Sequence, residues 1–158
     1  MLIKTHKLLI YKVANSYCSD IDEQEDLIQE IIYQLIKSYS RFDHRVKITT
    51  WMYKVALNVA ITHYRKLKTR QKYFIPIHEK LVRVYDSPEQ LENEHIIKLR
   101  GFVQKLDPLN KAIMIMYLDG NSHTDIAEAM GITVTNVGTK ISRIKHQLKK
   151  KFNQEKNG

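Results

Sequence analysis

Aromatic and cationic side chains alternate along residues 51–72, and this pattern is suited to binding single-stranded nucleic acid. Bases stack on exposed rings at about 1–3 kcal/mol each, while lysine and arginine neutralise the phosphates. The preceding residues, 40–50, add three cations and one aromatic ring. Ordinary core packing explains any single ring equally well, so the interpretation depends on the combination. The side chains expected to lie mostly off the core face of this segment are Trp51, Tyr53, Lys54, Asn58, Tyr64, Arg65 and Lys66.

A second segment, residues 119–149, has the spacing of a DNA-binding helix-turn-helix. Ala127 is small enough to let two helices approach, Gly131 can make the tight turn between them, and Val137 would fill the angle. Ser122, with Asp125 three residues later, predicts a capping box on the first helix, and Thr133 predicts a cap on the second. The same spacing also occurs in ordinary helical hairpins, which is the alternative interpretation.

The composition of the second helix favours DNA binding. Its first residues, 133–139, are small and polar, and such side chains suit base edges and phosphates in the major groove. An apolar stripe of Val137, Ile141, Ile144 and Leu148 follows at spacings of three and four. Beside this stripe lie the cations Lys140, Arg143, Lys145, Lys149, Lys150 and Lys151.

The overall charge indicates a polyanionic partner. The 158 residues carry a formal net charge of +9, with a pI near 9.5. The cations are concentrated in residues 31–72 and 96–158, whereas residues 20–30 contain six acidic and no basic side chains. Residues 73–95 are also acidic on balance.

Several other classes of protein find no support in the sequence. A single cysteine, Cys18, excludes an internal disulfide and a multi-cysteine zinc site, and the seven histidines show no metal-ligand spacing, so we expect neither metal nor cofactor. No carboxylate cluster, glycine-rich phosphate loop or nucleophile–base pair indicates an enzyme. No apolar run approaches the length of a membrane span, so we expect a cytoplasmic protein that does not insert into membranes.

Helices must position these side chains in the first half of the chain. Periodicity predicts an amphipathic helix over residues 2–18 and another over residues 24–39. The apolar face of the second comprises Leu27, Ile28, Ile31, Ile32, Leu35 and Ile36. Its amino end is acidic, which the helix dipole alone favours and commonly explains, and a docking surface for a basic partner is the alternative interpretation.

Residues 40–50 have the composition of a loop, and Thr49 or Thr50 can cap the helix that follows over residues 51–72. The core face of that helix is predicted to be Met52, Val55, Ala56, Val59 and Ala60.

The second half begins with an acidic segment, residues 73–95, that lacks clear periodicity and is interpreted as a linker. Ser87 followed by Pro88 predicts a helix start, and that helix should run to about Leu106. Asp107 with Pro108 predicts the cap of another helix, which ends near Leu118 before the helix-turn-helix. The prediction is an all-α fold with two small helical domains, residues 1–72 and 96–153, joined by the flexible linker 73–95.

The order of these motifs is similar to that of bacterial RNA polymerase sigma factors of the extracytoplasmic-function (ECF) type. Residues 25–30, EDLIQE, resemble the conserved region 2 motif of that family. Residues 50–53, TWMY, together with Asn58 and residues 64–66, resemble its promoter-opening helix, and residues 87–89, 106–108 and 119–149 resemble region 4.

The resemblance implies a factor that directs promoter recognition and transcription initiation. A strip of Asp26, Leu27, Gln29 and Glu30 is expected to dock on the β′ coiled coil of core RNA polymerase, and region 4 to touch the polymerase β flap. The −10 element would be recognised and opened by Arg41, Phe42, His44, Arg45, Lys47, Thr50, Trp51, Lys54, Asn58, Tyr64 and Arg65. The −35 element would be read by Thr133, Thr135, Asn136, Thr139, Lys140, Arg143 and Lys145. An anti-sigma factor is expected as an inhibitory partner.

Some positions depart from the family pattern. Thr62 stands where many members have aspartate, and Gly138 stands in the recognition helix where a longer, often basic, residue is usual. Glycine there costs about 1 kcal/mol of helix propensity and removes one DNA contact. His44 and Lys47 make the loop more basic, which leaves the preferred −10 base open.

Two other nucleic-acid functions compete with this interpretation. A stand-alone helix-turn-helix regulator would bind duplex DNA without polymerase, but duplex readers do not need the stacking rings of the first half. An RNA-binding protein would account for the first half and leave the helix-turn-helix unexplained.

Overall fold

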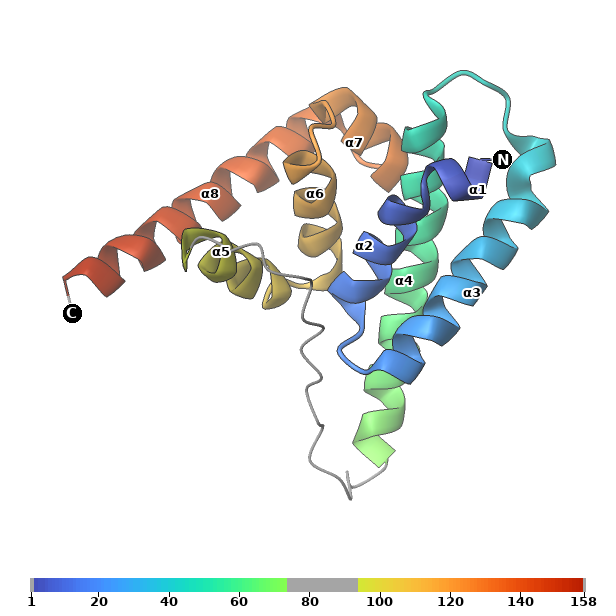
Figure 1. The fold of residues 1–158 in the computed structure, drawn as a ribbon. Helices are drawn as coiled ribbons and strands as arrows, with labels where there is room; N and C mark the ends of the chain where they lie inside the picture. The colour runs from blue at the N-terminus through green and yellow to red at the C-terminus, as the bar shows by residue number, and fades with distance from the viewer. Residues whose placement is uncertain (1, 74–93, 158) are drawn as a thin grey trace. The chain divides into compact units, whose positions relative to one another are not determined.

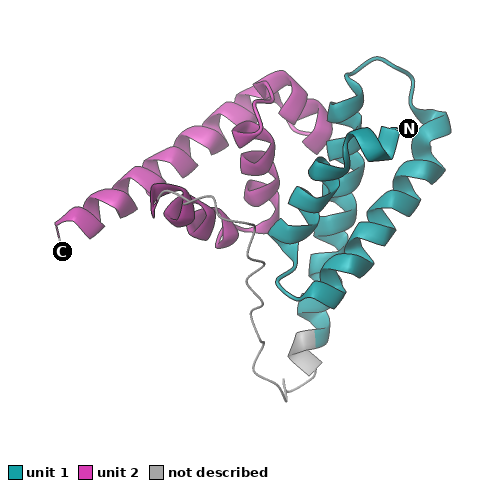
Figure 2. Ribbon diagram, in the orientation of Figure 1, with its two compact units in different colours: residues 1–89 teal, residues 90–158 magenta. Residues whose placement is uncertain are grey.

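The computed structural model describes residues 2–73 and 94–157, which are helical apart from short connections (Figure 1). The described elements are α1 (Leu2–Thr5), α2 (Lys7–Tyr17), α3 (Ile21–Ser38), the 3-10 turn η1 (Tyr39–Arg41), α4 (Ile48–Tyr73), α5 (Glu94–Gln104), α6 (Pro108–Leu118), α7 (His123–Met130) and α8 (Val134–Lys156). The chain divides into two compact units, residues 1–89 and 90–158 (Figure 2). The prediction of an all-helical fold is confirmed.

The first unit is built on α2, α3 and α4, each of which packs against the other two. Leu27, Ile31 and Leu35 recur at a spacing of four and form the buried side of α3. The other buried side chains of these helices are Leu9, Ile10, Val13, Ala14 and Tyr17 from α2, and Thr50, Met52, Tyr53, Ala56, Leu57 and Ala60 from α4.

The buried arc of α4 differs from the predicted one. Tyr53 is 1% exposed and Leu57 is fully buried, whereas Val55 and Val59 are half-buried. The physical reason is that α4 is covered by both α2 and α3, so it buries a wider arc than an amphipathic helix with one neighbour. The prediction that Tyr53 lies off the core face is wrong.

Two helix starts also differ from the predictions. The helix α3 begins at Ile21, three residues early, because the Asp20 carboxylate caps it and accepts from the Asp22 backbone N–H at 3.1 Å. The helix α4 begins at Ile48, so Thr49 and Thr50 lie in its first turn and neither is the cap.

The second unit contains α5, α6, α7 and α8, and α6 packs against the other three. The predicted caps are confirmed: the side chains of Asp107, Ser122 and Thr133 accept from the backbone N–H three residues later, at 2.9, 3.1 and 3.0 Å. Gly131 ends α7 in the left-handed conformation, at φ 67°, as the turn requires. The helix α8 continues to Lys156, seven residues beyond the predicted segment.

Part of the predicted linker, residues 73–95, lies outside the described residues, as does the predicted helix start at Ser87 and Pro88. At its ends, Tyr73 is the last residue of α4, and Glu94 and His95 are the first residues of α5. Among the helices that the structure describes, none is both long and apolar enough to cross a membrane. The same residues contain no group of three or more His, Cys, Asp or Glu side chains that could hold a metal ion.

Candidate nucleic-acid interfaces

Four rings meet where η1, the following loop and the start of α4 come together. The Phe42 and Trp51 centroids are 5.2 Å apart with planes at 37°, and Tyr39 approaches Trp51 edge-on at 6.1 Å. His44 lies 4.5 Å from Phe42. Tyr39 and His44 are exposed, and Phe42 and Trp51 are half-buried, so this aromatic cluster of Tyr39, Phe42, His44 and Trp51 can present ring faces to a ligand.

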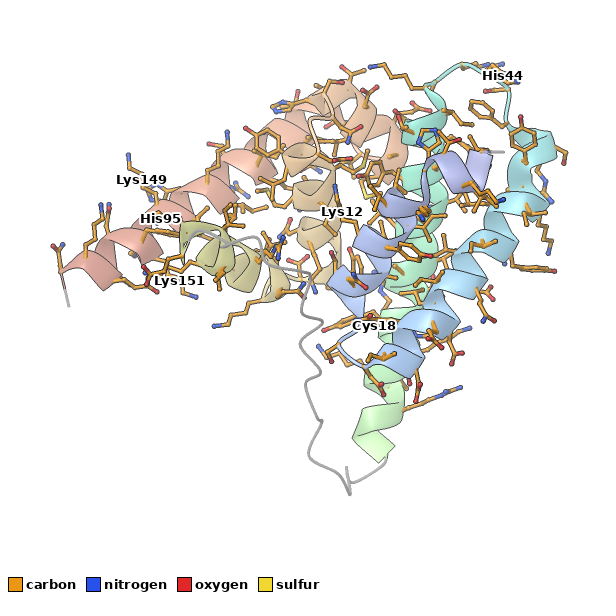
Figure 3. All side chains as sticks on the ribbon, in the orientation of Figure 1. Lys12, Cys18, His44, His95, Lys149 and Lys151 are labelled. Atoms are coloured by element: carbon orange, nitrogen blue, oxygen red, sulfur yellow. The ribbon has the colours of Figure 1, made fainter. Side chains whose placement is uncertain are left out.

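The loop that carries the cluster is held by its own acidic residue. The Asp43 carboxylate accepts from the Arg45 backbone N–H at 3.2 Å and pairs with Arg45 Nε at 3.1 Å. Both side chains are more than half exposed, so the ion pair is weak and Arg45 can exchange it for a phosphate. His44, which is labelled in Figure 3, has a left-handed backbone at φ 63°, a conformation that histidine adopts more readily than most residues.

The exposed face of α4 extends the aromatic cluster. Trp51, Lys54, Asn58 and Arg65 follow at spacings of three, four and seven, which places them on one face, and the last three are exposed. Tyr64 points elsewhere, because its ring packs edge-on against Tyr17 of α2 at 6.3 Å. The sequence had predicted that Tyr64 acts at the −10 element together with these four residues.

Thr50 is a further correction within the predicted −10 set. Thr50 is 1% exposed, and its Oγ1 has no hydrogen-bond partner among the described residues. A side chain buried at the base of α4 cannot contact DNA directly. Its part in this region is to pack under the first turn of the helix.

The acidic strip on α3 is exposed except at one position. Asp26, Gln29 and Glu30 are exposed, and the Glu30 carboxylate accepts from the Gln34 amide at 3.1 Å. Leu27 is fully buried and anchors the helix, and its predicted part in docking stays a prediction.

Two apolar side chains that sequence reasoning missed continue this strip. Tyr33 is 56% and Ile36 is 65% exposed, and they follow Gln29 at successive helical spacings of four and three. Periodicity had placed Ile36 in the core, and no local signal separated it from Ile32. We refer to the exposed row Asp26, Gln29, Glu30, Tyr33 and Ile36 as the α3 stripe.

An open groove of about 640 Å³ runs between α3 and α4 and connects two predicted sites. Its α3 wall carries Asp26 and Glu30, and its α4 wall carries Asn58, Lys66 and Arg70. Where α3 begins, Glu23 Oε2 lies 3.2 Å from Nε2 of His63, across 40 residues of sequence. Asn58, expected at the −10 element, therefore borders the α3 stripe, which the sequence had treated as separate.

In the second unit, α7 and α8 form the helix-turn-helix around Gly131. Thr135, Asn136, Thr139 and Arg143 are exposed and Lys140 is half-buried, while Val137, Ile141 and Ile144 are buried. Asn136, Lys140 and Arg143 share one face by their spacing of four and three. This row is the candidate base-reading surface.

Three other members of the predicted −35 set are engaged within the protein. The Thr133 hydroxyl caps α8, and the Thr139 hydroxyl donates to the Thr135 carbonyl at 3.0 Å. Lys145 lies on the opposite side of α8, with Nζ 4.6 Å from the centre of the Tyr117 ring. Lys145 is therefore separated from the row of Asn136, Lys140 and Arg143.

The carboxyl end of α8 is fixed to α5. Lys98 Nζ pairs with Glu155 Oε2 at 3.1 Å, and the His95 ring stacks on Phe152 at 6.3 Å. Figure 3 labels His95, Lys149 and Lys151 in this region.

The charge of α8 suits a helix that approaches DNA. The helix carries seven lysine and arginine residues and a single acid, Glu155, which makes it strongly cationic.

Two sequence families match these units. Sigma-70 region 2 matches residues 2–70, and Sigma-70, region 4 matches residues 96–148. The ECF RNA polymerase sigma factor SigW of Bacillus subtilis (strain 168) is 27% identical over 166 residues, covering 96% of this chain and 87% of SigW. SigX of the same organism, also an ECF RNA polymerase sigma factor, is 26% identical over 146 residues, covering 88% of this chain and 75% of SigX.

Solved structures share the fold. The sigma factor RpoE from Bartonella quintana, crystallised with the anti-sigma factor NepR, has a TM-score of 0.68 at 19% identity, with 94% of each chain covered. CnrH, solved with the cytosolic domain of CnrY, has a TM-score of 0.67 at 16% identity, covering 97% of this chain and 86% of CnrH. Together with the two family matches, these relatives show that the chain belongs to the ECF-type RNA polymerase sigma factors, non-enzymatic proteins with sigma-70 regions 2 and 4 that direct promoter recognition and transcription initiation.

Proposed function

We propose that the two units divide the work of initiation through three surfaces. The α3 stripe docks the factor on the β′ coiled coil of core RNA polymerase. Its support is the combination of the exposed acids Asp26 and Glu30 with exposed apolar Tyr33 and Ile36, since protein interfaces join an apolar centre to a polar rim. Leu27, buried beneath, holds the helix that presents them.

The aromatic cluster and the α4 face of Lys54, Asn58 and Arg65 open the −10 element. Opening exposes bases that have lost their stacking partners, at a cost of a few kcal/mol, and rings offset part of it. The cluster offers half-buried rings that are already in contact, so little side-chain freedom is lost when a base stacks on them. The cations Arg41, Arg45 and Lys47 of the loop would neutralise the displaced strand.

The row Asn136, Lys140 and Arg143 of α8, with Thr135 and Thr139, reads the −35 element in the major groove. Arginine and asparagine make the bidentate contacts that distinguish guanine and adenine. The exposed apolar residues Ile96 and Ile97 of α5 are candidates for the contact with the polymerase β flap.

We also propose that an anti-sigma factor controls this protein in the cytoplasm. NepR and CnrY are bound to RpoE and CnrH in the solved relatives, which supports a partner of the same kind.

The observation that carries the proposal is that the first unit presents rings in contact with one another, whereas the second presents a helix-turn-helix. Run-off transcription with core polymerase and fragments of the source genome, with and without the protein, tests it. The proposal predicts new discrete transcripts whose start sites share two upstream motifs. A single shared motif, or salt-sensitive duplex binding that polymerase does not enhance, would contradict the division between units.

A further inference from the structure

Two contacts join the last turns of α8 to the first turns of α5. The ring of His95, labelled in Figure 3, stacks on that of Phe152 with centroids 6.3 Å apart and planes at 27°. Lys98 Nζ lies 3.1 Å from Glu155 Oε2. On each helix the two partners are three residues apart, so they share one helical face. We refer to these four residues as the α5–α8 clasp.

Most of the clasp lies outside the residues that match Sigma-70, region 4. The match covers residues 96–148, so it contains Lys98 but not His95, Phe152 or Glu155. The helix α8 continues past the match to Lys156. The clasp is therefore a feature of this chain for which the family match does not account.

Core packing holds the second half of α5 but not its first turn. Val103 is buried, and Leu99, Phe102 and Leu106 pack against the same cluster. Residues 94–98, in contrast, are all exposed. A helix of 11 residues is marginal by itself and depends on tertiary contacts. The first turn of α5 therefore depends on contacts outside the core, and the clasp supplies two of them.

The clasp residues of α5 stand on either side of its exposed apolar pair. His95 directly precedes Ile96, and Lys98 directly follows Ile97. Ile96 is 46% and Ile97 is 55% exposed. If this turn frayed, only the fraction of molecules in which it is helical could bind a partner through the pair, and the apparent affinity would fall by that fraction.

We propose that the α5–α8 clasp holds Ile96 and Ile97 in position for the polymerase β flap, so that Phe152 and Glu155 are positioning residues for this contact. The far end of the recognition helix thereby organises a protein-binding surface, while its beginning faces DNA. The inference rests on the proposed contact between α5 and the β flap, so its test must separate the two.

The test measures the affinity of the full-length protein for core RNA polymerase and for core polymerase whose β flap tip is deleted. F152A removes the stacked ring, F152Y keeps it, and N153A is the matched control at the next, exposed position of α8. I97A reports on the proposed flap contact itself. Thermal melting of each variant reports on folding.

We expect F152A to bind intact core polymerase about two- to tenfold more weakly, which corresponds to the loss of one aromatic pair. F152A should bind the flap-deleted polymerase as the unaltered protein does. F152Y should recover most of the affinity, and N153A should bind normally.

The ion pair gives a second test that does not depend on the ring. K98E and E155K each place like charges together and should weaken binding to intact core polymerase about two- to fivefold, as expected for an exposed pair. The double variant K98E/E155K restores the attraction with the charges exchanged, so it should recover most of the affinity. A double variant that binds no better than the single ones would overturn the role of Glu155.

Three results with the ring variants would overturn the inference. If I97A weakens binding while F152A behaves as N153A does, the flap contact stands and the clasp does not position it. If F152A weakens binding to both polymerases equally, its effect does not act through the flap. If I97A binds intact core polymerase normally, the proposed flap contact fails and the role of the clasp fails with it.

Discussion

The rings of Phe42 and Trp51 lie 5.2 Å apart between centroids, with their planes tilted by 37°. Phe42 belongs to the loop after η1 and Trp51 to the first turn of α4, so the contact ties a loop to a helix. A ring pair that is already in contact offers an unpaired base a rigid surface. Trp51 is also the single tryptophan of the chain, so the tryptophan signal of the protein comes from this site.

Replacing Trp51 with alanine should impair promoter opening and spare polymerase binding. Loss of one stacked base contact, about 1–3 kcal/mol, corresponds to an opening equilibrium roughly 5- to 150-fold lower. Permanganate reactivity of −10 thymines measures opening, and co-purification with core polymerase measures binding. W51F should open the promoter to an extent between those of W51A and the unaltered protein. Y11A, which removes a 43%-exposed ring of α2, should open it as the unaltered protein does. Equal loss of opening and binding in W51A would contradict the role given to Trp51.

Reversing the charge of Glu30 should have the opposite effect. A lysine in the α3 stripe places a like charge against a basic partner, so E30K should lower the affinity for core polymerase by at least about tenfold. E128K is the matched control: it makes the same charge change at an exposed helical position of α7, outside the α3 stripe. Surface plasmon resonance against immobilised core enzyme would show the difference, and equal affinities for E30K and E128K would refute docking through this stripe.

Leu27 should behave as a core residue. Because its side chain is fully buried, L27A should lower the free energy of unfolding by about 2–5 kcal/mol in urea denaturation. L27M, which keeps the volume, should cost less than about 1.5 kcal/mol. L27M should also bind core polymerase normally. Weak polymerase binding by a stably folded L27M would return Leu27 to the docking surface.

Thr50 should tolerate loss of its hydroxyl. Its buried Oγ1 has no partner among the described residues, and leaving such a group unpaired costs about 1–3 kcal/mol. T50V removes the hydroxyl at nearly constant shape and should raise the free energy of unfolding by about 1 kcal/mol while leaving promoter opening unchanged. Lower stability, or a defect in opening, would show that the hydroxyl has a partner in the working protein.

Two glycines of the helix-turn-helix should respond to alanine with opposite signs. Neither position has a neighbour closer than an ordinary contact, but Gly131 has φ +67° and Gly138 lies within α8. G138A should stabilise by about 1 kcal/mol through helix propensity. G131A should destabilise by about 1–2 kcal/mol, because an alanine Cβ is strained in the left-handed region. Thermal unfolding gives the change in melting temperature for each variant. A change of the same sign in both variants would contradict the assigned backbone roles.

The second unit could be predicted closely because its signals are local. Ser122, Gly131 and Thr133 each act on the backbone within three or four residues, so the sequence around them is sufficient to place the helix ends. The first unit could be predicted as helices but not in its packing. The burial of Tyr53 and Thr50 depends on α4 being covered from two sides, and no local pattern contains that information.

The candidate interfaces could likewise be predicted only where their signals are local. Rings and cations along α4 indicated a nucleic-acid surface, yet the sequence could not tell that Tyr64 packs on Tyr17 while Trp51 meets Phe42. Ile36 fits the apolar periodicity of α3 as well as any core residue, and only the arrangement of the three helices leaves it exposed. Contacts between distant residues, such as Glu23 with His63, likewise follow from the tertiary fold.

Transcription from duplex and pre-melted promoters tests the central claim, that opening and docking belong to different surfaces of the first unit. The promoter is prepared as a full duplex and as a heteroduplex whose −10 region is unpaired, and each is transcribed with the unaltered protein, W51A and E30K. We expect the unpaired template to restore transcription by W51A and to leave E30K defective, because only W51A fails at strand separation. Restoration of both variants, or of neither, would contradict the separation of docking on α3 from opening by the aromatic cluster.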